Sequence, residues 1–339
     1  MTDEPERVIR VEEPSAGLVA FIVLDSTALG PAAGGVRTKA YATEEDALSD
    51  AKRLARAMTY KCALGGLAAG GGKAVVMARD DLDRPAAFAA MGRAIEALEG
   101  AFRTAGDFGT TDADLAAMAA QCRYVHTDTP NLAEAVGRGV LRCAEACADV
   151  KGRAVGDLTI AVQGAGDIGA AVVEAFTAAG ATVRVADLDR TRAEAVAART
   201  GATVVAPSGV LFEDVDLVSP CAIGDVVSTE TVPRLKAWAV CGGANNICVD
   251  HAAHRALHES GVLFVPDLVS SAGAVIDGIG QTVMGLADRA ELIDALRDTA
   301  AAILADARDS DAPPLTHALR RAAANLGAAA NLGTHLSAN

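Results

Sequence analysis

Two lysines stand at the ends of a stretch that carries no other charge. Lys61 follows Met58-Thr59-Tyr60, and Lys73 follows the three glycines at 70–72, twelve positions later. An ammonium group in apolar surroundings is poorly solvated, so the pKa of such a lysine falls and the neutral amine can act as a general base. We therefore expect one lysine to hold an anion while the other moves protons. The alternative is that both side chains run along the edge of a core and keep their ammonium groups in water.

Asp107 is a third residue whose type and position could carry chemistry. It lies in a glycine-rich segment that follows an expected strand at 101–104 and precedes an expected helix. Side chains at strand ends frequently carry the chemistry of α/β proteins. The alternative is a turn residue without a chemical role. Asp112 and Asp114 need no such role, because acids at the start of a helix are stabilised by its dipole.

A dinucleotide-binding pattern occupies the middle of the chain. Gly164, Gly166 and Gly169 form G-x-G-x-x-G between an expected strand at 158–163 and a helix at 168–178, and Asp187 closes the next strand. Such glycines permit a tight turn and let a pyrophosphate approach the helix N-terminus, while the acid binds the adenosine ribose. A carboxylate there repels a 2′-phosphate, which favours NAD over NADP. The alternative is that the glycines serve packing alone.

Two further strand ends carry small and polar residues, at 219–222 and 242–246. In a sheet that binds NAD, loops at the carboxyl ends of the strands face the cofactor. The expected cofactor-binding residues are Gly164, Gly166, Asp167, Ile168, Gly169, Asp187, Cys221, Ala222, Ala244 and Asn245.

The elements that must position these residues follow from the hydrophobic pattern. An apolar run at 18–24 predicts a strand buried on both faces, and an amphipathic helix with Thr43 as N-cap delivers Lys61 at its C-terminal end. Lys73 leads into a short buried strand at 74–77. After residue 150 strands and helices alternate, which is typical of a doubly wound α/β sheet, and residues 281–339 are expected to be helical.

Composition excludes several classes of function. The chain has 339 residues, of which 51% are hydrophobic, and a formal charge of −14. This charge argues against nucleic acid or an anionic membrane as a partner. We expect no signal peptide and no membrane span, and the seven scattered cysteines fit free thiols in a reducing cytoplasm.

Two weaker patterns do not change this interpretation. Gly72-Lys73 is not a nucleotide P-loop, because Leu67 stands where that motif needs glycine and Ala74 where it needs Ser or Thr. His251, His254 and His258 have helical spacing, but no acid or thiol is suitably placed beside them, so we expect an exposed helix face and no metal.

Taken in order, the motifs resemble those of the glutamate/leucine/phenylalanine/valine dehydrogenase family, most closely its shorter branched-chain and aromatic members. The resemblance covers about residues 18–300. It rests on the segments at 30–37, 58–61, 70–73, 107–111, 164–169, 219–222, 242–246 and 266–267.

The resemblance implies an α/β substrate domain at residues 1–130, a Rossmann NAD domain at 131–299, and a helical segment at 300–339 that returns to the first domain. It places the active site in the cleft of the molecule. It also implies a homodimer or a larger homo-oligomer.

The same resemblance implies a role for each motif residue. Lys61 binds the substrate α-carboxylate, Lys73 activates water, and Asp107 shuttles protons to the substrate nitrogen. The field of Lys61 is expected to help depress the pKa of Lys73. Gly34 and Gly35 let the substrate lie against backbone, and Met58 and Ala33 touch its side chain. The implied reaction is reversible, NAD-dependent oxidative deamination of an apolar L-amino acid, branched or aromatic, to its 2-oxo acid and ammonia.

Three positions depart from the family pattern. Ala33 stands where leucine-active relatives usually carry a larger apolar residue, which predicts room for a bulkier substrate side chain. Ser271 stands where an asparagine commonly contacts substrate and nicotinamide, and Gly106 replaces the usual acid before Asp107. These departures leave open a different NAD-dependent reaction on the same scaffold, such as reduction or coupling of a 2-oxo acid, or a silent sensor of NAD or an amino acid.

Overall fold

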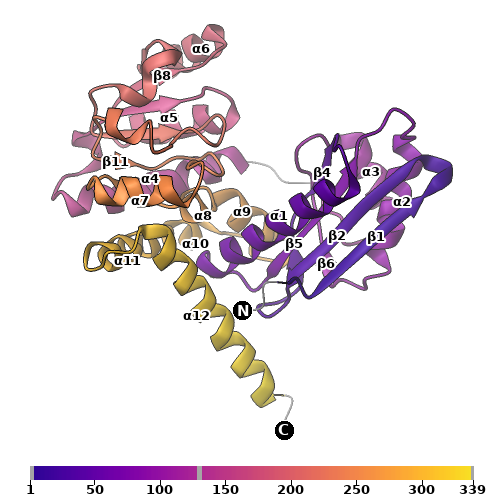
Figure 1. Cartoon of the computed structure of the whole chain (residues 1–339). Helices are drawn as coiled ribbons and strands as arrows, with labels where there is room; N and C mark the ends of the chain where they lie inside the picture. Colours follow the sequence, from indigo (N-terminus) through magenta and orange to yellow (C-terminus); the bar gives the residue numbers. More distant parts are fainter. Residues whose placement is uncertain (1–3, 128–131, 337–339) are drawn as a thin grey trace. The chain divides into compact units, whose positions relative to one another are not determined.

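The computed structural model describes residues 4–127 and 132–336 and is shown in Figure 1. Its internal contacts divide the chain into two compact units. Unit 1 comprises Met1–Pro130, Gly278–Ala287 and Ala322–Asn339, and unit 2 comprises Asn131–Asp277 and Asp288–Arg321. Residues 300–321, expected in the segment that returns to the first domain, therefore belong to unit 2. The physical reason is that α11 (Leu296–Arg308) packs on α4 (Leu132–Val150), a helix of that unit.

Unit 1 is built on a mixed sheet. Its elements are β1 (Arg7–Glu13), β2 (Leu18–Ser26), β3 (Ala32–Ala33), β4 (Val36–Lys39), α1 (Glu44–Leu64), β5 (Gly70–Met77), α2 (Arg84–Glu96), β6 (Phe102–Arg103) and α3 (Asp112–Ala119). The strand order is β1-β2-β5-β3-β6, with β4 also paired to β5. β2 runs antiparallel to its neighbours β1 and β5, whereas β3 and β4 lie parallel to β5. The strand expected at 18–24 is present, and it is buried as the apolar run predicts.

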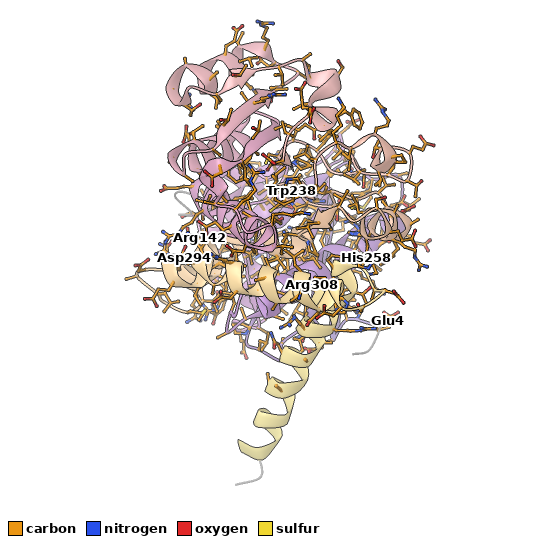
Figure 2. All side chains as sticks on the ribbon, turned by 90° about the vertical axis from the view of Figure 1, so that its left-hand side faces the viewer. Glu4, Arg142, Trp238, His258, Asp294 and Arg308 are labelled. Atoms are coloured by element: carbon orange, nitrogen blue, oxygen red, sulfur yellow. The ribbon has the colours of Figure 1, made fainter. Side chains whose placement is uncertain are left out.

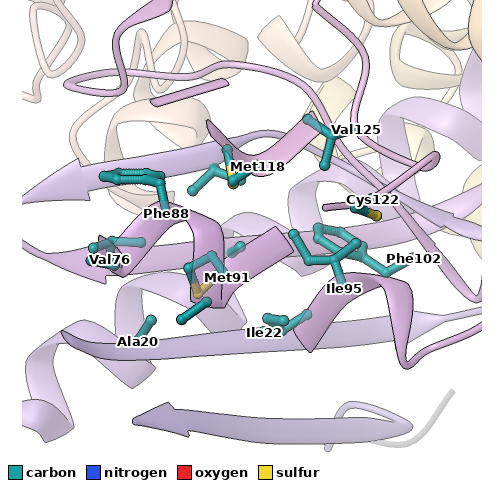
Figure 3. Packing of buried hydrophobic residues seen from close by; sticks show 14 of the residues in the cluster. Ala20, Ile22, Val76, Phe88, Met91, Ile95, Phe102, Met118, Cys122 and Val125 are labelled. Carbon is teal, nitrogen blue, oxygen red and sulfur yellow. The ribbon is translucent and has the colours of Figure 1, made fainter. Parts of the chain in front are cut away.

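Both faces of this sheet are covered by apolar side chains. One face packs against α2 and α3 through large buried residues that include Phe88, Met91 and Phe102 (Figure 3). The other face packs against the alanine-rich side of α1, where Ala47, Ala51 and Ala55 are fully buried. Small side chains let the helix backbone lie close to the strands, and this close packing sets the distance between the C-terminal end of α1 and the sheet.

Helix α1 begins as the sequence predicts. The Thr43 hydroxyl accepts a hydrogen bond from the backbone of Asp46, and the Asp46 carboxylate accepts one from the backbone of Thr43, which is a capping box. The helix ends at Leu64, so Lys61 lies in its last turn as expected.

The glycines before Lys73 are part of β5, whereas the sequence placed the start of this strand at residue 74. All eight residues of β5 are buried. A Cβ at Gly70 would lie 1.8 Å from the Ser26 carbonyl oxygen, and a Cβ at Gly71 would lie 2.1 Å from the Thr59 backbone nitrogen. Glycine is therefore required because β2 and α1 approach β5 too closely for any side chain.

Unit 2 is built on a six-stranded parallel sheet. Its strands are β7 (Thr159–Gln163), β8 (Thr182–Ala186), β9 (Thr203–Val204), β10 (Leu217–Pro220), β11 (Ala239–Val240) and β12 (Leu263–Phe264). They lie in the order β12-β11-β10-β7-β8-β9. The order reverses at β7, because β8 and β9 extend to one side and β10 to β12 to the other. This is the Rossmann order, and it confirms the predicted doubly wound sheet.

Helices complete unit 2 and lead back to unit 1. They are α4, α5 (Asp167–Ala178), α6 (Arg190–Thr200), α7 (His251–Glu259), α8 (Asp267–Ser270), α9 (Gly273–Thr282), α10 (Ala290–Asp294), α11 and α12 (Pro314–Leu336). Asp294 on α10 accepts hydrogen bonds from Arg138 and Arg142 on α4 at 2.6–2.7 Å, and Figure 2 shows Arg142 beside Asp294. The later part of α12 belongs to unit 1, where the Asn325 side-chain amide donates to the Ala63 carbonyl oxygen at 2.9 Å.

No helix within residues 4–127 and 132–336 combines the length and the apolar content that crossing a bilayer requires. All seven cysteines are buried free thiols, as the sequence predicts.

Candidate functional site

Lys73 and Asp107 form a largely buried ion pair. The Lys73 Nζ atom lies 2.9 Å from the Asp107 Oδ2 atom, and the exposed fractions of the two side chains are 7% and 27%. Lys73 extends from the middle of β5, while Asp107 lies between the end of β6 and the start of α3. The sheet places them together because β3 joins β5 to β6 in parallel register. A proton donor and a proton acceptor are thus in direct contact, with Asp107 the more accessible of the two.

The two charges alter each other's proton affinity. Burial lowers the pKa of Lys73 below its ordinary value, although the Asp107 carboxylate opposes this shift. Burial alone would raise the pKa of Asp107, but the Lys73 ammonium and the Arg37 guanidinium outweigh it, so this pKa is held below its ordinary value. The pair therefore has a lysine that loses its proton more readily than usual and a carboxyl that stays ionised.

Arg37 is a charged residue of this site that the sequence analysis did not single out. Its Nε atom donates to Asp107 Oδ2 at 2.9 Å, and its other end reaches Asp50 Oδ2 at 3.3 Å. It also acts on Lys73, because its positive charge lowers the pKa of the lysine in addition to burial. Side chains alternate between the two faces along β4, so Arg37 lies on the face opposite to the buried Val36 and Thr38. This pattern does not identify the residues that Arg37 contacts elsewhere in the chain.

Lys61 is buried in the last turn of α1, with 8% of its surface exposed. A polar cluster anchors this end of the helix to β2. The Thr59 hydroxyl donates to Asp25 Oδ2 at 2.6 Å, and Arg56 Nε donates to Asp25 Oδ1 at 2.6 Å. Asp25 is itself buried, and a buried carboxylate needs hydrogen-bond donors such as these two to compensate for the loss of water. The backbone that carries Lys61 is therefore held firmly against the sheet.

Three residues of the expected substrate surface gather around the same strands. A Cβ at Gly34 would lie 1.9 Å from the Gly72 carbonyl oxygen and 3.5 Å from Met58, and a Cβ at Gly35 would lie 2.8 Å from the Asp107 Cβ. The chain's own backbone therefore already requires both glycines. Ala33 is buried and pairs with Gly71 across β3 and β5.

The three glycines of the nucleotide turn have different surroundings. Gly164 has a φ of +100°, and a Cβ there would lie 2.8 Å from the Ala222 Cβ; a Cβ at Gly169 would lie 2.0 Å from the Gly164 carbonyl oxygen. At Gly166, by contrast, no atom of a residue other than its neighbours along the chain lies within 4 Å of the position that a Cβ would take. Gly164 and Gly169 are thus needed by the fold, whereas Gly166 leaves open space where the family pattern puts a pyrophosphate. This donor set fits a dinucleotide.

Asp187 stands beside this turn. Its Oδ2 atom accepts a hydrogen bond from the Ala165 backbone at 2.7 Å, and its Oδ1 atom accepts one from Asp189 at 2.8 Å. The carboxylate therefore bridges the ends of β7 and β8. Helix α5 begins at Asp167 with Gly166 as its N-cap and no side-chain cap, so the first backbone N–H groups are available to an anion. Ile168 follows in the first turn.

The loop after β10 contacts the end of β7, and the loop after β11 contacts the end of β10. The Cys221 backbone donates to Gln163 at 2.7 Å, and the Ala244 backbone donates to Pro220 at 3.0 Å. Ser271 Oγ lies 3.2 Å from the Asn245 side-chain oxygen and donates to the Asp267 carbonyl oxygen at 2.7 Å. The predicted cofactor residues, with Ser271, thus belong to unit 2, whereas Lys61, Lys73, Asp107 and the glycines at 34–35 belong to unit 1.

The histidine helix differs from its expected form. His254 is buried and lies 5.2 Å from the Phe264 ring, so only His251 is fully on the exposed face. His258 contacts the Ser310 carbonyl oxygen at 3.2 Å. In the described part of the chain, no three or more His, Cys, Asp or Glu residues are arranged to hold a metal ion.

Comparison with known proteins gives consistent matches over most of the chain. Residues 5–124 match the Glu/Leu/Phe/Val dehydrogenase dimerisation domain, and residues 184–283 match the Glutamate/Leucine/Phenylalanine/Valine dehydrogenase domain. The chain is 36% identical to a leucine dehydrogenase of Thermoactinomyces intermedius over 80% of its length and 77% of that protein. It is 36% identical to a valine dehydrogenase of Streptomyces albus, with coverage of 93% and 90%.

Among solved structures, the chain resembles L-tryptophan dehydrogenase from Nostoc punctiforme. The TM-score is 0.87 and the sequence identity 31%, over 96% of this chain and 97% of that one. Two domain matches, the level of identity and the shared two-domain architecture agree with the motif order read from the sequence. The chain belongs to the glutamate/leucine/phenylalanine/valine dehydrogenase family.

Proposed function

We propose that this protein is an NAD-dependent dehydrogenase that converts an apolar L-amino acid reversibly into its 2-oxo acid and ammonia. The observation that carries the proposal is the buried contact of Lys73 with Asp107 at 2.9 Å, with the pKa of both groups below its ordinary value. A lysine that is neutral more often than usual suits a general base, and an ionised carboxylate beside it can return the proton. A protein that only senses a ligand needs no such pair.

Each of the three ionisable residues has its own task in the proposed reaction. Lys61 pairs with the substrate α-carboxylate and keeps its proton. When bound, NAD+ would supply the acceptor for the hydride of the substrate Cα, so that a substrate with a neutral amino group becomes a protonated imine. Lys73 in its neutral form takes a proton from water as the water oxygen attacks the imine carbon. Asp107 passes this proton from Lys73 to the substrate nitrogen. Lys73 then takes the hydroxyl proton as the carbonyl forms, the C–N bond breaks and ammonia leaves.

The family is NAD(P)-dependent, and we assign NAD to this chain. Asp187 supports this choice because its carboxylate is held by the Ala165 and Asp189 backbones beside the open space at Gly166. A fixed negative charge favours the two hydroxyls of a ribose and repels a 2′-phosphate. The residues assigned to the cofactor are those of the turn at 164–169 and the loops at 221–222 and 244–245.

The substrate is proposed to carry an apolar side chain, branched or aromatic. Relatives at 36% identity are a leucine and a valine dehydrogenase, and a structural relative at 31% identity acts on L-tryptophan. Ala33 supports the bulkier end of this range because it replaces a larger residue of leucine-active relatives. Met58, Gly34 and Ser271 are the other residues proposed to contact the substrate.

Two further properties accompany this assignment. The match of residues 5–124 to a dimerisation domain supports a homodimer or a larger homo-oligomer. Seven buried free thiols support a cytoplasmic location, since a reducing compartment keeps cysteines unpaired.

The test is a panel of amino acids of graded size assayed with NAD+ and NADP+, and of 2-oxo acids assayed with NADH. We expect oxidation of apolar amino acids, and reduction of the matching 2-oxo acids only when ammonium is present. Reduction without ammonium would replace this proposal with a different reaction on the same scaffold. Binding of NAD without any turnover would replace it with a sensor.

A further inference from the structure

Arg37 contacts Asp107 through the same oxygen atom that Lys73 uses. Asp107 Oδ2 lies 2.9 Å from Lys73 Nζ and 2.9 Å from Arg37 Nε. Arg37 comes from β4, which is parallel to β5 and pairs with it. The two donors therefore approach one carboxylate oxygen from neighbouring strands, and together they define where that oxygen lies.

The other end of the Arg37 guanidinium is also held. It lies 3.3 Å from Asp50 Oδ2 on α1, and the Tyr41 hydroxyl donates to that same Asp50 oxygen at 2.7 Å. The exposed fraction is 22% for the Arg37 side chain and 13% for Asp50. A planar guanidinium fixed at both ends cannot rotate away from Asp107 without losing a half-buried ion pair.

The ionisable groups of the cluster around Asp107 and Arg37 come from four parts of unit 1. They are Lys73 on β5, Arg37 on β4, Tyr41 in the turn after β4, and Asp50 on α1, whose second oxygen contacts Arg53. Among these groups, Arg37 is the cation that contacts Asp107 and keeps its charge at every physiological pH. Lys73, in contrast, has to lose its proton in the proposed reaction.

We infer that Arg37 is a positioning residue of the reaction: it fixes the Asp107 carboxylate beside Lys73 and keeps it ionised when Lys73 is neutral. This inference rests on the proposed function. When the Lys73 ammonium gives up its proton, Asp107 loses one of its two cationic partners. The Arg37 guanidinium remains, so the carboxylate passes the proton on to the substrate nitrogen and does not retain it.

Arg37 shifts the pKa of Asp107 and the pKa of Lys73 in the same direction. The charge of Arg37 lowers the pKa of Asp107 and also that of Lys73. Removing it with Arg37→Gln should therefore move both limbs of the pH profile of kcat/KM toward higher pH, by about half a unit to one unit. Loss of the contacts that Arg37 makes with Asp107 and Asp50 should also lower kcat/KM at the optimum pH by about ten- to a hundredfold.

Arg37→Lys separates charge from position. A lysine keeps the positive charge but cannot contact Asp107 and Asp50 at once, so the limbs should stay near those of the wild type while kcat remains several-fold reduced. Arg10→Gln is the matched control. Arg10 also joins a strand to α1, through Glu44 at 2.8 Å, but it is an exposed pair at the start of the helix. We expect it to leave rate and profile unchanged.

A carboxyl ¹³C NMR titration of Asp107, assigned with Asp107→Asn, gives a readout that needs no turnover. An Asp107 pKa that is equal in the wild type and Arg37→Gln would overturn the inference, as would unchanged pH limbs in an active variant. If Arg37→Gln does not fold, Arg37→Lys decides, and wild-type kcat in that variant would overturn the positioning role. A wild-type protein without turnover on the amino acid panel would refute the proposed function, while the titration still tests the charge effect of Arg37.

Discussion

The Lys73 Nζ atom lies 2.9 Å from Asp107 Oδ2, with the lysine almost fully buried and the carboxylate partly open. The contact joins the middle of β5 to the segment after β6, and it exists because β3 pairs with both strands in parallel. The chemistry that we propose depends on this ion pair.

Lys73→Ala should lower kcat by about 10²- to 10⁴-fold, the usual contribution of a general base. NAD binding should be unchanged, because the residues assigned to the cofactor belong to unit 2. Steady-state kinetics and calorimetric titration with NAD measure the two effects separately. Lys52→Ala is the control, since Lys52 is an exposed lysine of α1 paired with Glu4. Turnover at the wild-type rate in Lys73→Ala would contradict the proposed mechanism.

The rate of oxidative deamination should rise with pH through the pKa of Lys73. Burial lowers this pKa from the ordinary lysine value of 10.5, so the neutral base appears at a lower pH than for an exposed lysine. The ascending limb of kcat/KM should accordingly be centred below pH 10.5. A limb centred at that value or above it would show that Lys73 is not the group that titrates.

Gly164 and Gly166 should respond differently to substitution. Gly166→Val should leave the thermal unfolding temperature nearly unchanged, since no atom beyond its chain neighbours lies within 4 Å of the Cβ position, but it should abolish measurable NAD binding. Gly164→Ala should destabilise unit 2 by about 1–3 kcal/mol, because a residue with φ of +100° is strained and its Cβ would meet Ala222. The two changes are measured by calorimetry and by NAD titration. Normal NAD affinity in Gly166→Val would argue against a dinucleotide at this turn.

Asp187→Asn should weaken the discrimination between NAD and NADP. The substitution removes the negative charge while an amide oxygen can still accept from the Ala165 backbone. We expect the ratio of kcat/KM values for the two coenzymes to fall about tenfold, mainly through better use of NADP. An unchanged ratio would mean that another group selects the coenzyme.

Asp294 should stabilise unit 2 in a pH-dependent way. Hydrogen bonds from Arg138 and Arg142 lower its pKa from 3.8 to about 2 in the folded chain. The folded state therefore binds this proton less readily than the unfolded state, and the stabilisation is complete above pH 4 and is lost as the pH falls toward 2. Because the side chain is 36% exposed, the contribution is only about 1 kcal/mol.

Urea unfolding of Asp294→Asn checks this prediction. The variant should be less stable than the wild type at pH 7, and the difference should shrink as the pH approaches 2. Asp309→Asn is the control, since its pair with Arg308 is highly exposed. A difference that does not depend on pH would mean that Asp294 acts through packing rather than through its charge.

The amino-acid sequence by itself determined the local structure and the identity of the motifs. Thr43 and Asp46 predict the start of α1, the apolar run at 18–24 predicts a buried strand, and G-x-G-x-x-G with Asp187 predicts the β7–α5–β8 unit. These signals are short-range, because capping, hydrophobic period and turn chemistry depend on residues only a few positions apart. Lys73 and Asp107 could be named from their motifs for the same reason.

The tertiary structure alone decided which charges meet. Arg37 contacts both Asp107 and Asp50 only because β4 and α1 pack on β5, and no local pattern encodes that arrangement. The glycines at 70–71 were likewise left outside the strand expected at 74–77, although they belong to β5, where Ser26 and Thr59 approach them closely. Side-chain contacts between distant segments depend on how elements pack, so burial, pKa and the partners of each ionisable group follow from the fold and not from spacing along the chain.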